Sequence, residues 1–327
     1  MTRPYIVECE ITNGCNLRCR HCYARSGDEP RKELHPEVIK DLMLQLKGIG
    51  LGYFDMIGGE PFTYPHLFEL IDFAGRIGLR VILNTNGTLI TREIALKLKD
   101  TNPHTLIGVS LDGSCPQIND LIRGEGNFTR AVKGVENLMK AGFNVTLLFV
   151  VAKVNWRDFG RYVDFARKIG VKAIYVDRFM PVGRGRINEE ILNMSIDEWV
   201  KALKFISDVV KGNSSDFIFY VGEALNGDPC TAGEEHFSIL CDGTVVPCGY
   251  FRYNPEFYLG NIKYEPVEAI FRRGKRIFSL PSRCAECQIY EKGCFGGCRA
   301  SSMIFAGRID LPDPVICRYK REFGTTL

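Results

Sequence analysis

The sequence predicts an α/β protein, in which a partial (β/α)6 barrel of the TIM type precedes a small cysteine-rich domain with a β-hairpin. Three observations support this prediction. Short β-branched, apolar runs alternate with helical patterns up to about residue 211. We count six such units, whereas a complete barrel has eight. The alternation stops at a polar stretch, 211–215, and eight of the 13 cysteines lie beyond it.

The predicted strands are short runs of β-branched and apolar residues, each followed by a helical stretch. They are 5–11, 53–57, 80–85, 105–111, 144–151 and 172–179. The first two helical stretches begin near Pro36 and Pro65, because proline suits the first turn of a helix. The later ones are 91–99, 128–141, 157–169 and 196–211. Strands separated by helices form a parallel sheet, because each helix brings the chain back to the end of the sheet at which the previous strand began.

Composition and charge exclude several classes of protein. The chain has 327 residues, a net charge of +3 and no basic stripe, so we expect no nucleic-acid partner. Its longest strongly apolar run, 145–152, is far short of the ~20 residues that span a bilayer. The first ten residues lack the pattern of a signal peptide. We therefore expect a cytoplasmic protein without a membrane partner, divided into domains 1–212 and 213–327 at the polar stretch.

Three cysteines follow the first predicted strand directly. Cys15, Cys19 and Cys22 have the spacing C-x3-C-x2-C, at the edge of a parallel sheet where active sites form. A [4Fe–4S] cluster needs four ligands, so three thiolates leave one iron open for a substrate or cofactor. The alternative is a zinc site that includes His21, although His21 directly precedes Cys22, which makes joint coordination awkward.

This cysteine loop resembles that of the radical S-adenosylmethionine (radical SAM) superfamily. GGEP at 58–61, NTNG at 84–87 and SLDG at 110–113 follow in order at the ends of predicted strands. The resemblance implies an enzyme whose open iron binds SAM. It further implies that reductive cleavage of SAM yields a 5′-deoxyadenosyl radical, which abstracts hydrogen from a substrate.

The resemblance also implies residues that bind SAM. Gly58, Gly59 and Glu60 would lie at its amino group, and Ser110 and Arg123 would hold its carboxylate. A purely structural alternative stays open for both groups: GGEP also suits a tight turn between strand and helix, and Arg123 also suits a surface turn. No catalytic residue is predicted beyond the cluster.

Seven cysteines of the second region resemble the SPASM domain, which extends radical SAM maturases. Their pattern is C-x12-G-x4-C, then C-x2-C-x6-C-x3-C, then a last cysteine 18 residues later. The middle gap departs slightly from the usual five residues. The resemblance implies three [4Fe–4S] clusters in the chain; the alternative is a pair of zinc sites. The implied ligands are Cys230, Cys248 and Cys298 for auxiliary cluster I, and Cys284, Cys287, Cys294 and Cys317 for auxiliary cluster II.

Auxiliary cluster I lacks an evident fourth ligand, and Cys241 is the nearest alternative. The dipeptide Asp242-Gly243 predicts a hairpin with a two-residue type I′ turn. In that register Cys241 pairs with Thr244, and Cys248 lies about 13 Å further along its strand. We therefore expect Cys241 to be no ligand of this cluster.

The same resemblances imply a peptide or protein substrate that is modified after translation. The alternative is decarboxylation or another modification of tetrapyrrole (haem-type) side chains, and the implied partner is a reductant such as ferredoxin or flavodoxin. Sulfatase maturases carry an aspartate after the second SPASM cysteine, but this chain has Gly249. A non-enzymatic iron–sulfur electron-transfer protein would need no GGEP or SLDG. The stretch RFMPVGRGR at 178–186 is interpreted as a loop. Asp177 and Arg178 either face the barrel interior near the substrate or pair with each other.

Overall fold

The computed structural model describes residues 4–274, 277–278 and 281–324. Its strands are β1 (Ile6–Thr12), β2 (Tyr53–Gly58), β3 (Val81–Thr85), β4 (Leu106–Ser110), β5 (Val145–Val151), β6 (Ala173–Arg178), β7 (Ile218–Val221), β8 (His236–Ile239), β9 (Thr244–Val246) and β10 (Gly260–Asn261). Within the described residues they form one sheet in the order β10-β9-β8-β1-β2-β3-β4-β5-β6-β7. Neighbours from β8 through β1 to β7 are parallel.

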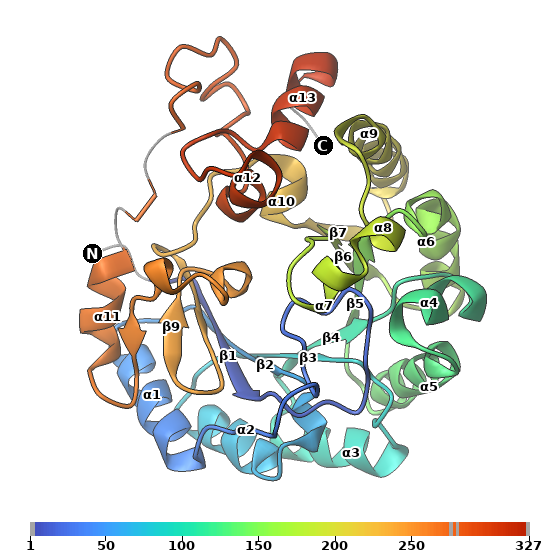
Figure 1. The fold of residues 1–327 in the computed structure, drawn as a ribbon. Helices are drawn as coiled ribbons and strands as arrows, with labels where there is room; N and C mark the ends of the chain where they lie inside the picture. The colour runs from blue at the N-terminus through green and yellow to red at the C-terminus, as the bar shows by residue number, and fades with distance from the viewer. Residues whose placement is uncertain (1–3, 275–276, 279–280, 325–327) are drawn as a thin grey trace.

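Helices α1 to α6 and α9 lie on the outside of this curved sheet, whereas α7 lies toward its interior (Figure 1). The helices are α1 (Pro36–Gly48), α2 (Leu67–Arg76), α3 (Arg92–Thr101), α4 (Pro116–Arg123), α5 (Asn127–Lys140), α6 (Phe159–Lys168), α7 (Arg184–Ile187), α8 (Glu189–Leu192), α9 (Ile196–Asn213), α10 (Glu223–Asn226), α11 (Val267–Gly274), α12 (Arg299–Ala306) and α13 (Pro314–Phe323). The predicted α/β class is confirmed, and β1 to β6 coincide with the six predicted strands within a few residues. The barrel is partial, because β7 and β10 form the two ends of the sheet.

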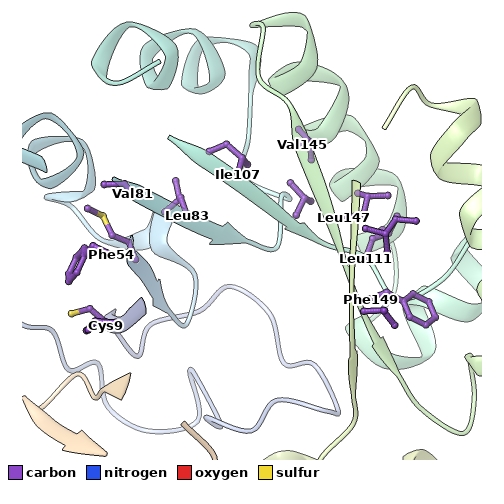
Figure 2. Close-up of a cluster of buried hydrophobic side chains, with 14 of the residues drawn as sticks. Cys9, Phe54, Val81, Leu83, Ile107, Leu111, Val145, Leu147 and Phe149 are labelled. Atoms are coloured by element: carbon purple, nitrogen blue, oxygen red, sulfur yellow. The ribbon is translucent and has the colours of Figure 1, made fainter. Parts of the chain in front are cut away.

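The main core lies between the outer face of the sheet and the helices. Successive side chains of a strand point to opposite faces, so Cys9 and its alternate neighbours in β1 are buried among apolar helix residues. Figure 2 shows Phe54, Leu83 and Ile107 continuing this apolar layer from strand to strand. The same alternation turns polar residues such as Glu8 and Asp55 to the concave inner face.

The sheet continues past the predicted domain boundary. The polar stretch 211–215 is the end of α9 and the turn after it, and β7 follows as a seventh parallel strand on β6. On the other side of the sheet, β8 pairs with β1. The division at residue 212 therefore remains a prediction, because one sheet includes strands from both sides of it. No helix in the described ranges has the length and apolar content to cross a membrane.

The predicted register of the hairpin is wrong by one residue. The N–H of Leu240 donates to the carbonyl of Thr244 at 2.8 Å, and the N–H of Gly243 donates to the carbonyl of Leu240 at 2.8 Å. Residues 241–243 therefore form a three-residue loop, which ends on Gly243 at a φ of +91°. Cys241 accordingly lies in the loop and does not pair with Thr244. A dipeptide signal does not distinguish this bulged loop from the two-residue turn, because both place glycine at a positive φ.

Candidate active site

The three cysteines of the first cluster motif lie on one loop at the carboxyl end of β1. Burial raises the pKa of Cys15 to about 11 and that of Cys19 to about 12, and in both cases the neighbouring Cys22 thiol adds to the increase. The electrostatic coupling shows that the loop brings these thiols close to one another. Buried thiols are released as thiolates when a metal binds them, so this arrangement suits a metal cluster.

Two glycines of the GGEP motif pack directly against the cysteine loop. The N–H of Gly59 donates to the carbonyl of Thr12, and the N–H of Glu60 donates to that of Gly14, both at 2.8 Å. A Cβ at Gly58 would lie 2.3 Å from the carbonyl oxygen of Thr12, and one at Gly59 would lie 2.0 Å from that of Gly14. Only glycine fits this approach of two loops. Binding of SAM by these glycines stays a prediction.

Glu60 joins the end of β2 to the end of β3. Its buried carboxylate accepts hydrogen bonds from the Thr85 hydroxyl at 2.6 Å, from the N–H of Asn86 at 2.7 Å and from the N–H of Phe62 at 3.2 Å. Burial raises its pKa, and these hydrogen bonds oppose the increase. Glu60 thus links the GGEP and NTNG motifs, and its predicted role at the SAM amino group stays a prediction.

The NTNG motif and the residue after it are joined to the cysteine loop by hydrogen bonds of side-chain amides. The Asn86 amide donates to the Asn16 side-chain carbonyl at 2.9 Å, and the Asn16 amide donates to the Thr88 hydroxyl at 2.9 Å. Asn16 is the residue after Cys15. The ends of β2 and β3 therefore position the first ligand of the motif.

Asp112 of the SLDG motif forms a buried ionic cluster beside the cysteine loop. Oδ2 of Asp112 is 2.9 Å from Nε2 of His21 and 2.7 Å from Nε of Arg123, while Oδ1 accepts the N–H of Val150. Burial alone would raise the pKa of Asp112, but Arg123 and His21 outweigh it and lower the pKa to about 2. Arg123 is only 7% exposed, so it is not a surface arginine.

The pair predicted for the SAM carboxylate is only partly assembled. Arg123 ends α4 and contacts Asp112, and no hydrogen bond joins it to Ser110 in the described residues. Ser110 ends β4 and precedes the buried Leu111-Asp112 turn. Asp112 lies in the SLDG motif, but the sequence pattern does not identify it as a functional residue. The local sequence does not show that its carboxylate contacts Arg123.

Arg184 is a second residue that the sequence pattern does not identify, and it clamps the cysteine loop. Its guanidinium donates to the carbonyls of Cys19 at 2.8 Å and Ser26 at 2.9 Å, and pairs with Asp28 at 2.6 Å. Gly183 before it has a φ of +60°, and a Cβ there would lie 2.1 Å from the carbonyl oxygen of Tyr23. The stretch 178–186, to which the sequence assigns no role, therefore docks on the cluster motif.

The cysteines of the second region come together as two sets. One set lines a single cavity of about 90 Å³; its members are Cys284, Cys287, Cys294 and Cys317. The other set is linked by electrostatic coupling, since burial and the neighbouring thiols of Cys298 and Cys230 raise the pKa of Cys248. The first set, auxiliary set II, contains the ligands predicted for auxiliary cluster II. The second set, auxiliary set I, contains Cys230, Cys248 and Cys298, which are predicted for auxiliary cluster I. Every predicted ligand is a thiol, the donor that iron–sulfur clusters require.

No three His, Cys, Asp or Glu side chains in the described ranges, the cysteines of the predicted clusters included, lie close enough together to hold one metal ion. His21 contacts Asp112 through Nε2, and its Nδ1 is buried without a hydrogen-bond partner, so this contact does not exclude the zinc alternative. Burial and the charges of Glu10 and Asp242 raise the pKa of Cys241 to about 11. That Cys241 is no ligand of auxiliary cluster I stays a prediction, now on the corrected register.

The cysteine loop and Cys248 meet at the inner face of the sheet through two tyrosines. Tyr23 follows Cys22 and packs edge-on against Tyr250, with ring centroids 5.4 Å apart. A Cβ at Gly249 would lie 2.8 Å from the Tyr23 ring, so a larger residue there would require the ring to shift. The first cluster motif and auxiliary set I therefore face the same part of the barrel interior.

Acidic side chains line this interior. Glu8 of β1 lies within electrostatic range of both Cys248 and Asp177. Burial raises the pKa of Asp177 to about 6, and Glu223 and Glu8 add to the increase. Arg178, by contrast, is turned outward and pairs with Asp313 in the core. The inner face between the two cysteine groups therefore carries carboxylates and tyrosines, and the carboxylates of Glu8 and Glu10 are paired with His236 and Arg252.

The fold and the site together define a class of protein. A three-cysteine loop after the first strand of a partial barrel, with two further thiol sets, is typical of iron–sulfur enzymes that bind a cofactor at an open iron. Comparison with known families agrees. Residues 9–166 match the radical SAM superfamily, and residues 230–288 match SPASM, an iron–sulfur cluster-binding domain.

Two curated relatives and two solved structures extend this comparison. An AdoMet-dependent heme synthase of Methanosarcina barkeri is 30% identical over 97% of each chain. Mycofactocin maturase MftC of Mycobacterium tuberculosis is 31% identical over 95% of this chain and 82% of its own. The structure of native anSMEcpe with bound AdoMet superposes with a TM-score of 0.79 at 20% identity, covering 98% of this chain and 96% of the other. Streptococcus suis SuiB bound to precursor peptide SuiA gives a TM-score of 0.78 at 17% identity, covering 96% and 76%.

The chain belongs to the radical SAM superfamily and carries a SPASM region. It is therefore an enzyme, and its cofactors are [4Fe–4S] clusters and SAM. This excludes the electron-transfer alternative.

Proposed function

We propose that this enzyme modifies a peptide or protein after translation, in the barrel interior between the cysteine loop and auxiliary set I. The observation that carries the proposal is the pairing of charges on the inner face, where Glu8 pairs with His236 and Glu10 pairs with Arg252. These paired cations leave no free positive charge among them for the several carboxylates of a tetrapyrrole. A peptide with neutral side chains needs no such charge. The relationship to a mycofactocin maturase supports the same substrate class.

We assign the cluster ligands as the sequence predicts. Cys15, Cys19 and Cys22 hold the SAM cluster. Two further sets hold the auxiliary clusters: Cys230, Cys248 and Cys298 for cluster I, and Cys284, Cys287, Cys294 and Cys317 for cluster II. When bound, the first cluster and SAM supply a 5′-deoxyadenosyl radical that abstracts hydrogen from the substrate.

The SAM-binding residues divide into two groups at neighbouring strand ends. Gly58, Gly59 and Glu60 form the wall at the amino group of SAM. Ser110 and Arg123 bind its carboxylate, and a guanidinium is suited to a two-pronged contact with a carboxylate. Asp112 keeps Arg123 in place through the 2.7 Å contact at Nε, and Nη2 of Arg123 lies 3.4 Å from Nε2 of His21.

The second candidate function is modification of tetrapyrrole side chains. It is favoured by the heme synthase relative, which matches this chain over 97% of both lengths. A reductant of the ferredoxin or flavodoxin type delivers the electron that either reaction needs. We further propose that the substrate enters at the open side of the barrel, between the barrel and the SPASM region, where the sheet does not close.

The experiment follows deuterium from substrate into 5′-deoxyadenosine. Reduced enzyme is incubated with SAM and with deuterated cell extract that is separated into peptide and tetrapyrrole fractions. Transfer from the peptide fraction supports the main proposal, and transfer from the tetrapyrrole fraction supports the second candidate. Transfer from free sugars or amino acids alone would refute both.

A triple variant tests the assignment of the SAM cluster independently of substrate. Replacing Cys15, Cys19 and Cys22 by alanine should lower the iron content from about twelve to about eight per chain. The variant should also form no 5′-deoxyadenosine with dithionite. Formation of 5′-deoxyadenosine by this variant would show that the assignment is wrong.

A further inference from the structure

A buried arginine lies between the two auxiliary cysteine sets, and no carboxylate of the described residues is within ion-pair distance of it, although Glu234 lines the same cavity. Arg299 is the first residue of α12 and is only 6% exposed. Its Nη1 atom is buried and has no hydrogen-bond partner, and no carboxylate pairs with its guanidinium among the described residues. Burying a charge without a partner is strongly unfavourable, so this position requires an anion that the side chains of the described residues do not supply.

Thiols and one phenol form the electrostatic surroundings of Arg299. Cys230, Cys284, Cys298 and Tyr290 lie within electrostatic range of its guanidinium. Cys230 and Cys298 belong to the set for auxiliary cluster I, and Cys284 belongs to the set for auxiliary cluster II. The guanidinium is therefore close to ligands of both clusters.

Two adjacent cavities place the side chain between these sets. Arg299 and Cys230 line a cavity of about 190 Å³, and Cys284 lines the separate cavity of about 90 Å³. Tyr290 lines both cavities. The amino end of α12 adds to the positive field, since the backbone N–H of Arg299 lowers the pKa of the Cys230 thiol.

We propose that Arg299 is the counter-charge shared by the two auxiliary clusters and that it raises the reduction potentials of both. A cluster held by thiolates becomes more negative by one charge when it accepts an electron. A fixed cation nearby therefore stabilises the reduced form more than the oxidised form. Arg299 acts through the clusters and is a positioning residue for electron transfer, not a group that contacts the substrate.

The test measures both potentials directly and needs no substrate. It uses full-length protein with the Cys15, Cys19 and Cys22 replacements, so that the only EPR signals are those of the auxiliary clusters. In this background Arg299→Gln should retain about eight irons. At a given applied potential the ratio of reduced to oxidised cluster should fall about tenfold at both clusters, a shift of about 59 mV to more negative potential.

Arg321→Gln is the matched control, because this exposed arginine lines only the cavity of auxiliary set II. It should leave auxiliary cluster I unchanged. Unchanged potentials in Arg299→Gln, or a shift at one cluster alone, would overturn the proposal.

A charge-conserving variant covers the case in which Arg299→Gln loses its clusters. Arg299→Lys keeps a cation at this position and should retain both clusters with potentials close to those of the parent. Loss of iron in Arg299→Lys as well would show that the shape of the side chain matters and its charge does not, which would also overturn the proposal.

Discussion

Replacing Arg184 by methionine should release the cysteine loop while leaving the rest of the barrel intact. Methionine has a similar length but donates no hydrogen bond, so the variant removes the bonds to the carbonyls of Cys19 and Ser26. It also removes the ion pair to Asp28, whose side chain is 25% exposed. Each of these contacts joins α7 to the loop that follows β1.

The structure allows the size of this effect to be worked out. A hydrogen bond from a charged donor contributes about 1.5–3 kcal/mol, so the two carbonyl contacts contribute at least about 3 kcal/mol. The partly exposed ion pair adds at most about 1 kcal/mol. A loss of about 3 kcal/mol raises the equilibrium constant for opening the loop by roughly 100-fold, since 1.4 kcal/mol corresponds to a factor of ten.

Amide hydrogen exchange is the direct assay. Exchange of residues 13–28 should accelerate by about two orders of magnitude in Arg184→Met, and 5′-deoxyadenosine formation should fall. Arg186→Met is the control, because the Arg186 side chain is 65% exposed and, within the described part of the chain, forms an ion pair with nearby Glu189 alone. We expect its effect to stay within about 0.5 kcal/mol. Equal exchange rates in the two variants would refute the clamp.

Three further predictions concern the hairpin, the core and the barrel interior. Cys241→Ala should keep all iron while Cys230→Ala should not, and loss of a cluster in Cys241→Ala would contradict the ligand assignment. Arg178→Met should destabilise the protein by about 3–5 kcal/mol in anaerobic unfolding experiments, because it leaves a fully buried carboxylate, Asp313, unpaired; a change below about 1 kcal/mol would refute this. The raised pKa of Asp177, about 6 against 3.8, means that the folded protein binds this proton more tightly than the unfolded chain. The favourable contribution of this proton to the free energy of unfolding is therefore complete below pH 3.8 and is lost as the pH rises through 6. Asp177→Asn should accordingly gain stability relative to wild type between pH 4 and pH 7. An equal difference in the free energy of unfolding between the two proteins at both pH values would exclude the raised pKa.

The sequence alone determined the fold class and the chemistry of the site. Strand and helix periodicities are local, so local patterns alone suffice to locate the six strands from β1 to β6. Cysteine spacing is also local, because a cluster motif such as Cys15 to Cys22 lies on one loop. The same applies to GGEP, which marks a strand end whatever the rest of the chain does.

Tertiary structure alone decided what holds these motifs together. Arg184 is 165 residues from Cys19, and no periodicity links two positions so far apart. The pairing of β8 with β1 is equally remote in sequence, and it places auxiliary set I beside the first cluster motif. Glycine at position 59 could be read as an approach to SAM or to another loop, and only the packed structure shows the loop of Gly14 against it. Residue patterns specify which chemistry the chain can do, whereas close packing between distant segments determines which partners each buried charge and each glycine has.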